Sequence, residues 1–300
     1  MSAQYPVLVV GDANIDLVVR GDVVPRFGQV EQLLEHASLV LGGSACIMAS
    51  GLAQLGVPTS VVAVIGDDEF GGIMRDSLVS AGVDVSAVHV DPQVPTGISV
   101  ILSTADDRAI LTLPGTVPLL TSAHVLAAVE SSQAHWVHFA SPFLMPEFTA
   151  GLPALLAELK AQGIRTSLDT NWDPADEWAG LGEVLPLIDV LLPNRAELDA
   201  ITAAVGEIEC RVVVKDGAAG GWSRSPDGTT VRAPGIRLDV VDTTGAGDSF
   251  DAGYLAAVAH GVADEQTRVR WAAVAGSLST RASGGTGAQA TLAQLREHLA

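Results

Sequence analysis

Short runs of β-branched and aliphatic residues alternate with helical stretches along most of the chain, and this alternation constrains the fold more than any other feature. The runs have the length of buried strands and occur at Val7–Val10, Val61–Ile65, Val137–Phe139, Thr166–Leu168, Val190–Leu192 and Val212–Val214. The helical stretches occur at Ala45–Leu55, Glu69–Ala81, Ala123–Val129, Leu152–Ala161, Glu197–Val205 and Ala246–Ala259. Such alternation predicts a three-layer α/β/α sandwich around a mainly parallel sheet.

Length and composition fit this architecture. A chain of 300 residues suits a single α/β domain spanning 1–300 with a small appendage, and 48% hydrophobic with 4% aromatic residues suits a core of aliphatic side chains. Two segments, Asn14–Val40 and Gly97–Leu113, break the alternation and have the character of extra strands. We expect them to form a small β-strand lid over the carboxyl edge of the sheet, where ligands bind in open α/β folds.

Charge and cysteine content exclude several classes of partner. The net charge of −19, from 35 acidic and 16 basic residues, argues against binding to nucleic acid or to an anionic membrane. Cys46 and Cys210 match no metal-binding spacing and fit a reducing compartment. No basic region precedes the first apolar run, and no run approaches ~18 apolar residues, so we expect a cytoplasmic protein.

The strongest local motif is Asp-Thr-Thr-Gly-Ala-Gly-Asp at 242–248, between a predicted strand at Arg237–Val241 and a predicted helix. Gly245 and Gly247 allow consecutive amides to face one point, where the helix dipole also favours an anion such as a phosphoryl group. Asp248 beside that anion makes sense as a base that takes a proton from an attacking hydroxyl. The alternative is a glycine turn in which Asp248 only caps the helix.

Other phosphate-binding motifs are excluded by particular residues. The chain has two lysines, Lys160 and Lys215, and neither stands in a G-x-x-x-x-G-K-[ST] loop. Phe250 occupies the place of the third glycine of a dinucleotide fingerprint, which argues against a dehydrogenase.

The 242–248 motif resembles the C-terminal signature of the ribokinase-like (PfkB) carbohydrate kinases. Further segments resemble other elements of that family, occur in the family's order and span almost the whole chain: Gly11–Asp16, Gly42–Gly43, Gly66–Gly71, Pro193–Glu197 and Lys215–Gly217. The resemblance implies a ribokinase-like fold and an ATP-dependent phosphotransferase that moves the γ-phosphate of ATP to a hydroxyl of a small sugar or sugar derivative.

The resemblance also implies roles at the reacting centre. Asp248 is expected to be the catalytic base. The amides of Gly245, Ala246 and Gly247 are expected to stabilise charge on the transferring phosphoryl group, with the two glycines also binding the nucleotide.

Further residues are implied to hold nucleotide and metal. Asn194, Lys215 and Gly217 would lie on the nucleotide side, and Asn194 with Glu197 would organise Mg²⁺ and its waters. By itself, Glu197 is an acid in the first turn of a helix. Many relatives also use potassium, which implies a site formed by Asp242, Thr244 and carbonyls within 283–287, although the segment 281–289 is longer and richer in glycine than its family counterpart.

On the acceptor side, the resemblance implies that Asn14 and Asp16 hydrogen-bond vicinal hydroxyls, beside Asp248. Gly42 and Gly43 would let the backbone approach the sugar ring. Without the resemblance, Asp16 is simply a polar residue near a strand end.

Four positions bear on the acceptor. Ile47 stands where many relatives have Asn, and Ala140 stands where ribokinase has a ribose-binding acid, so ribose is disfavoured. Asp169 and Asn171 end a strand and are expected to point into the cleft. Asp173 precedes a proline and is predicted to be a structural helix cap.

Two alternatives stay open: a nucleoside kinase of the same fold, for which Cys46 and Ile47 would line a base-tolerant pocket, and a catalytically silent sugar or nucleotide sensor. A retained Asp248 argues against the sensor. Because lid strands expose an edge, we also expect a homodimer in which two lids pair.

Overall fold

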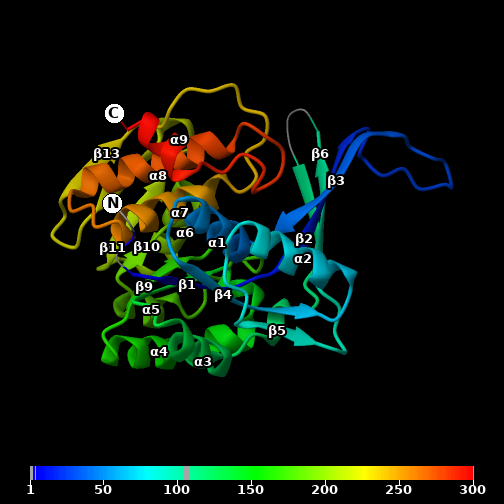
Figure 1. Ribbon diagram of the computed structural model, residues 1–300. Helices are drawn as coiled ribbons and strands as arrows, with labels where there is room; N and C mark the ends of the chain where they lie inside the picture. The colour runs from blue at the N-terminus through cyan, green and yellow to red at the C-terminus, as the bar shows by residue number, and fades with distance from the viewer. Residues whose placement is uncertain (1–2, 4, 105–107, 300) are drawn as a thin grey trace.

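One large sheet forms the centre of the fold (Figure 1) in a computed structural model that describes residues 3, 5–104 and 108–299. Within these residues, nine strands make up the sheet in the order β13-β12-β11-β10-β9-β8-β1-β4-β5. Their bounds are β1 Val7–Val10, β4 Thr59–Gly66, β5 Val88–Asp91, β8 Trp136–Ala140, β9 Arg165–Asp169, β10 Val190–Leu191, β11 Arg211–Lys215, β12 Gly221–Arg224 and β13 Thr230–Ala233. Pairing is parallel from β5 to β11, and β12 and β13 add antiparallel strands at one edge.

Helices cover both faces of this sheet, as Figure 1 shows. Their bounds are α1 Ser44–Gln54, α2 Glu69–Ser80, α3 Ser122–Ser132, α4 Pro146–Ala161, α5 Leu181–Val184, α6 Arg195–Val205, α7 Ala246–Ala259, α8 Glu265–Ser279 and α9 Leu292–Glu297. Short 3₁₀ turns are η1 Val117–Leu119, η2 Pro142–Leu144, η3 Leu185–Leu187 and η4 Gly217–Ala219. No helix in the described ranges is long and apolar enough to cross a bilayer.

The alternation of side chains along β1 creates two separate cores. Val7 and Val9 point into a cluster formed with α1, α2, α7 and α8, whereas Leu8 and Val10 point into a cluster formed with α3, α4 and α6. A strand buried on both faces must be apolar throughout, which explains why the strands read as continuous aliphatic runs. The predicted three-layer α/β/α sandwich is confirmed.

A second sheet lies beside the sandwich, and its β2–β3 hairpin projects away from it (Figure 1). Its strand order is β3-β2-β6-β7, with bounds β2 Asn14–Gly21, β3 Leu34–Gly42, β6 Gly97–Ser103 and β7 Arg108–Leu113. These strands come from the two segments that broke the alternation. Positions 105–107 of the predicted lid lie outside the described residues.

Two local predictions were wrong. Residues 237–241 form no strand: Pro234 and Gly235 follow β13, and the chain then runs irregularly until the Val241 amide donates to the Thr280 carbonyl. Asp173 caps no helix; its carboxylate instead accepts three amides of the turn that follows, from residues 175, 177 and 178, so its role is still structural.

Candidate active site

The loop at 242–248 ends in the first turn of α7, and this turn has open amide donors. Gly245 is the N-cap residue with a φ of 71°, and no side chain caps the helix. The Ala246 amide donates to the Thr243 carbonyl at 3.2 Å, whereas the amides of Gly245 and Gly247 have no acceptor within the described residues. Unpaired amides at the positive end of a helix dipole are suited to bind an anion.

Packing requires a glycine at 245. A Cβ atom there would lie 2.5 Å from Cα of Gly285 and 3.0 Å from Cγ2 of Ile47, in addition to needing a left-handed backbone. The loop is therefore held between α1 and the segment that follows α8.

Two cavities lie on opposite sides of this loop. One, of about 250 Å³, includes Thr244, Gly245 and Asp248 in its lining together with side chains of the second sheet. The other, of about 570 Å³, includes Ala246 and Gly247 together with residues of η4 and α8. A wider hollow of about 960 Å³ between α3 and α4 contains none of the predicted site residues. The loop thus separates two ligand-sized spaces and faces both.

The smaller cavity collects the residues predicted to bind an acceptor. Asn14, Asp16 and Gly43 line it, and Asn14 Nδ2 donates to Asp16 Oδ1 at 2.7 Å and to Ser99 Oγ at 3.3 Å. Gly42 lies behind this pair, because a Cβ atom there would be 2.2 Å from Asp16 Oδ1. β2, β3 and β6 therefore present a fixed polar cluster to the cavity.

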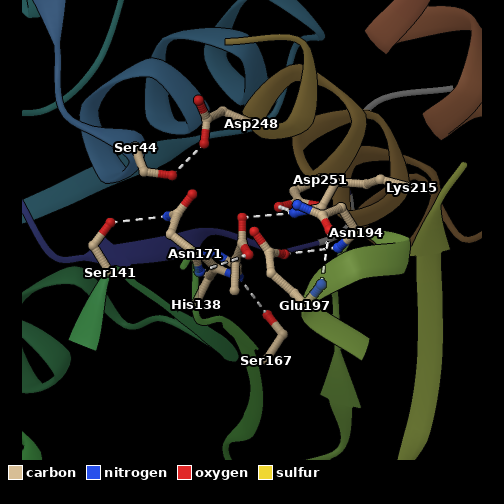
Figure 2. Close-up of polar contacts among 11 residues, drawn as sticks. Ser44, His138, Ser141, Ser167, Asn171, Asn194, Glu197, Lys215, Asp248 and Asp251 are labelled. Atoms are coloured by element: carbon tan, nitrogen blue, oxygen red, sulfur yellow. Dashed lines mark hydrogen bonds and ion pairs between the residues drawn. The ribbon is translucent and has the colours of Figure 1, made fainter. Parts of the chain in front are cut away.

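Asp248 lies in the wall of the same cavity and accepts a hydrogen bond from the Ser44 hydroxyl (Figure 2). Burial, followed by the charge of Asp169, raises the pKa of Asp248 to about 7, although the Ser44 hydrogen bond and the charge of Lys215 act in the opposite direction. A carboxylate with a pKa near neutrality can both accept and release a proton.

Ser44 is positioned by a carboxylate from another part of the chain. Asp12, which is 4% exposed, accepts the amides of Ser44 at 3.1 Å and Ala45 at 3.2 Å and thereby caps α1. Gly43 cannot provide this cap, and a Cβ atom on it would lie 2.5 Å from the Asp12 carbonyl oxygen.

A buried ion network is formed around Lys215, which lines the cavity of about 570 Å³. Lys215 Nζ lies 2.7 Å from Asp169 Oδ2 and 3.1 Å from Asp251 Oδ2, and Figure 2 shows Lys215 beside Asp251. The Lys215 side chain packs against Gly247, where a Cβ atom would lie 3.4 Å from Lys215 Cδ. Burial lowers the pKa of Lys215, but the carboxylates of Asp169, Asp251 and Glu197 outweigh it and hold the ammonium charged.

The two aspartates of the network differ in acidity. Burial opposes ionisation of Asp169, but the charge of Lys215 together with the hydrogen bonds from Asp251 and Lys215 outweighs burial, and the pKa of Asp169 lies below its ordinary value. Burial raises the pKa of Asp251 well above its ordinary value. A proton in this network is therefore held more readily by Asp251 than by Asp169, which limits the negative charge gathered around Lys215.

Asn194 and Glu197 form a capping box at the start of α6. Asn194 Oδ1 accepts the Glu197 amide at 2.9 Å, and Glu197 Oε2 accepts the Asn194 amide at 2.7 Å. They line neither cavity but lie beside Lys215 and Asp251 (Figure 2). In the described residues no group of three acidic, His or Cys side chains is placed to hold a metal ion.

Asp242, predicted to hold potassium, already has hydrogen bonds to both carboxylate oxygens. Oδ1 accepts the Thr244 amide at 2.9 Å and its hydroxyl at 2.8 Å. Oδ2 accepts the Gly284 amide at 3.1 Å and the Arg20 guanidinium at 3.1 Å. Four donors match the roughly four lone-pair sites of a carboxylate, so this side chain does not fit as a cation ligand.

The other residues predicted from the sequence lie in the cavity linings, in the ion network and in the core. Gly217 lines the cavity of about 570 Å³, and Ile47 and Asn171 line the cavity of about 250 Å³. Asp169 points to Lys215 rather than to the acceptor side. Ala140 is buried at the end of β8, outside both linings.

Three residues of the site were not identified from the sequence: Asp12, Ser44 and Asp251. Asp251 could have been found, because it follows Asp248 by three positions on a helix and so lies on the same face. Asp12 and Ser44 carry no local signal, since their roles depend on contact between β1 and α1.

Comparison with known proteins agrees with this geometry. The model of the pfkB family of carbohydrate kinases matches residues 6–292. An ATP-dependent ribose-1-phosphate kinase of Halopiger xanaduensis is 33% identical over 264 residues, covering 83% of each chain. A fructokinase of Klebsiella pneumoniae is 30% identical over 304 residues, covering 92% of this chain and 93% of the relative. The structure of Arabidopsis thaliana ribokinase with ribose and ATP superposes with a TM-score of 0.84 at 25% identity, covering 100% of this chain and 99% of that one.

Proposed function

The chain belongs to the pfkB family of carbohydrate kinases, and from this premise we propose that it transfers the γ-phosphoryl group of ATP to a hydroxyl of a small neutral sugar. The observation that carries the proposal is the loop at 242–248, which has open amides and a base with a pKa of about 7 and lies between two cavities. ATP is assigned to the larger cavity and the acceptor to the smaller one.

In this reaction Asp248 takes the proton of the acceptor hydroxyl while the hydroxyl oxygen forms a bond to the γ-phosphorus. The bond from that phosphorus to the bridging oxygen breaks, and ADP leaves with the electron pair. Charge builds up on the phosphoryl oxygens, where the amides of Gly245 and Gly247 and the dipole of α7 stabilise it. One such donor contributes about 3 kcal/mol in comparable sites.

Magnesium is the metal that the site suits. Bound with ATP, it would neutralise charge on the phosphates. Asn194 and Glu197 supply oxygen atoms for its waters, and Lys215 adds a fixed positive charge next to Gly247.

The charges around the acceptor cavity define the class of substrate. Its lining includes Asp12, Asp16 and Asp248 and, within the described residues, no Lys, Arg or His. A phosphate or carboxylate group on the acceptor would meet this negative field without a counter-charge. Neutral polyols are favoured, with Asn14 and Asp16 binding two of their hydroxyls.

The test is ADP release with ATP and Mg²⁺ across pentoses, hexoses, ketoses, sugar acids, phosphorylated sugars and nucleosides, with Asp248→Asn as the blank. Turnover on a neutral sugar that disappears in the blank supports the proposal. Preferred turnover of a sugar phosphate would refute the charge argument. Nucleotide binding without ADP release from any acceptor would favour the silent sensor.

A nucleoside is the second candidate acceptor. Four aliphatic side chains line the acceptor cavity and could pack against a base: Ile47, Ile101, Ile110 and Leu144. Faster turnover of a nucleoside than of its free sugar in the same screen would select this alternative.

We also propose that the second sheet acts as a lid on one α/β domain and pairs with its copy in a homodimer. The lid carries exposed aliphatic side chains, including Leu34 at 46%, Leu111 at 59% and Leu113 at 54%. β3 and β7 are the two edge strands of this sheet, and an exposed edge strand can pair with another chain. Sedimentation at micromolar concentration should give a dimer mass, and a monomer mass would remove this proposal.

A further inference from the structure

An arginine from the second sheet lies against the carboxylate that shapes the anion-binding loop. Arg20 is near the end of β2, and its Nη2 atom lies 3.1 Å from Oδ2 of Asp242. The pair is partly buried, with 29% of the Arg20 side chain and 11% of the Asp242 side chain exposed. An ion pair in such a setting is screened less by salt than one on the open surface.

Asp242 connects this arginine to the loop. Its other oxygen accepts both the amide and the hydroxyl of Thr244, the residue before Gly245. These two hydrogen bonds fix Thr244 against Asp242, directly before the residues whose amides are open. The position of Asp242 therefore influences where the amides of Gly245 and Gly247 point.

The segment after α8 completes the enclosure of this carboxylate. Gly284 donates its amide to Asp242, and a Cβ atom on Gly284 would lie 3.2 Å from Cγ2 of Val40 in β3. The neighbouring Gly285 packs against Gly245. This is the glycine-rich stretch in which carbonyl groups were expected to hold potassium, and here it supplies an N–H donor to the same carboxylate.

Arg20 also has unused donor capacity. Its Nε atom is buried and has no hydrogen-bond partner within the described residues. A guanidinium carries a permanent charge and a fixed set of five donors, so it stays cationic and oriented at any working pH. A metal ion placed beside it would be repelled and would find the four lone-pair sites of Asp242 occupied.

We propose that the guanidinium of Arg20 supplies the fixed positive charge behind the anion-binding loop in place of a monovalent cation, so that this kinase does not depend on potassium. Arg20 is a positioning residue that acts through Asp242. The effect of Arg20 on turnover rests on the proposed function, but its effect on MgATP binding can be measured without an acceptor.

The test measures MgATP affinity by calorimetry, and turnover on any acceptor found, in KCl and in tetramethylammonium chloride at equal ionic strength. For the wild-type protein we expect both quantities to agree within about 2-fold between the two salts. Arg20→Gln should lose about 10-fold or more in MgATP affinity in tetramethylammonium, the range found when a supporting partner of a site is removed, and Arg20→Lys should stay within about 3-fold of wild type.

Arg26→Gln is the matched control, because Arg26 also belongs to the β2–β3 hairpin but pairs with Asp22 in solvent, with 61% of its side chain exposed. It should bind MgATP as the wild type does. An increase of about 10-fold in wild-type turnover or MgATP affinity on adding potassium would overturn the proposal. So would an Arg20→Gln variant that binds MgATP as tightly as the wild type, or an Arg20→Lys variant as weak as Arg20→Gln. Absence of turnover with normal MgATP binding would count against the proposed function alone.

Discussion

Replacing the proposed base should make this protein more stable while it abolishes activity. The pKa of Asp248 lies at about 7 instead of 3.8, chiefly because the carboxyl group is buried. One pKa unit corresponds to about 1.4 kcal/mol, so keeping this carboxylate ionised in the folded protein at pH 8 costs at most about 4 kcal/mol. The carboxyl group is buried, but the residue as a whole keeps some exposure on the cavity side and water can reach it, so we expect Asp248→Asn to raise the free energy of unfolding by ~1–2 kcal/mol.

The gain in unfolding free energy that Asp248→Asn brings should increase as the pH rises. The folded wild type holds the Asp248 proton up to about pH 7, whereas the unfolded chain releases it near 3.8, so wild-type stability falls as pH rises between these values. Asn has no proton to lose. The advantage of Asp248→Asn should therefore be largest at pH 8, shrink to about a third at pH 5 and vanish below about pH 4.

Urea denaturation followed by tryptophan fluorescence at pH 5 and pH 8 measures this difference, and ADP release measures activity. Turnover should fall by ~10²-fold or more with MgATP affinity nearly unchanged. Asp199→Asn, an exposed acid on α6, is the control and should change stability by less than about 0.5 kcal/mol. An Asp248→Asn variant no more stable than wild type at pH 8, or equally stabilised at both pH values, would refute the reasoning.

Three further predictions follow from the site. Ser44→Ala removes the hydroxyl that lowers the pKa of Asp248, so the rising limb of kcat plotted against pH should move above pH 7 in assays from pH 5.5 to 9. An unmoved limb would mean that Ser44 does not influence the proposed base. Gly42→Ala places a Cβ 2.2 Å from Asp16 Oδ1, so the KM for the acceptor should rise about 10-fold with MgATP affinity unchanged, and a selective loss of MgATP binding would contradict this. Lys215→Met leaves buried carboxylates without their cation and should lower the free energy of unfolding, measured by urea denaturation, by about 3–5 kcal/mol. A Lys215→Met variant as stable as the wild type would mean that the network contributes nothing to stability.

Part of the fold was predictable because it rests on periodicity. The strand β1 is apolar at every position, which is required when both faces of a strand are covered, and the sandwich follows from repeating that unit. The strand predicted at 237–241 is absent because composition alone does not make a strand. Val240 and Val241 have the composition of a strand but are 62% and 52% exposed, because no strand among the described residues pairs with this segment. Composition indicates what a segment can form, and pairing decides whether it does.

The sequence by itself determined the glycine turn at 242–248 and the carboxylate at its end, because glycine conformation, amide direction and helix polarity act within a few residues of each other. Only the tertiary structure decided which groups surround that loop. The Ser44–Asp248 and Arg20–Asp242 contacts join residues 204 and 222 positions apart in the chain. Such pairs depend on strand order, register and the packing of α1 and α7, and no local propensity encodes them. The protonation of Asp248 and the occupation of Asp242 by a guanidinium follow from burial and charge in the folded protein.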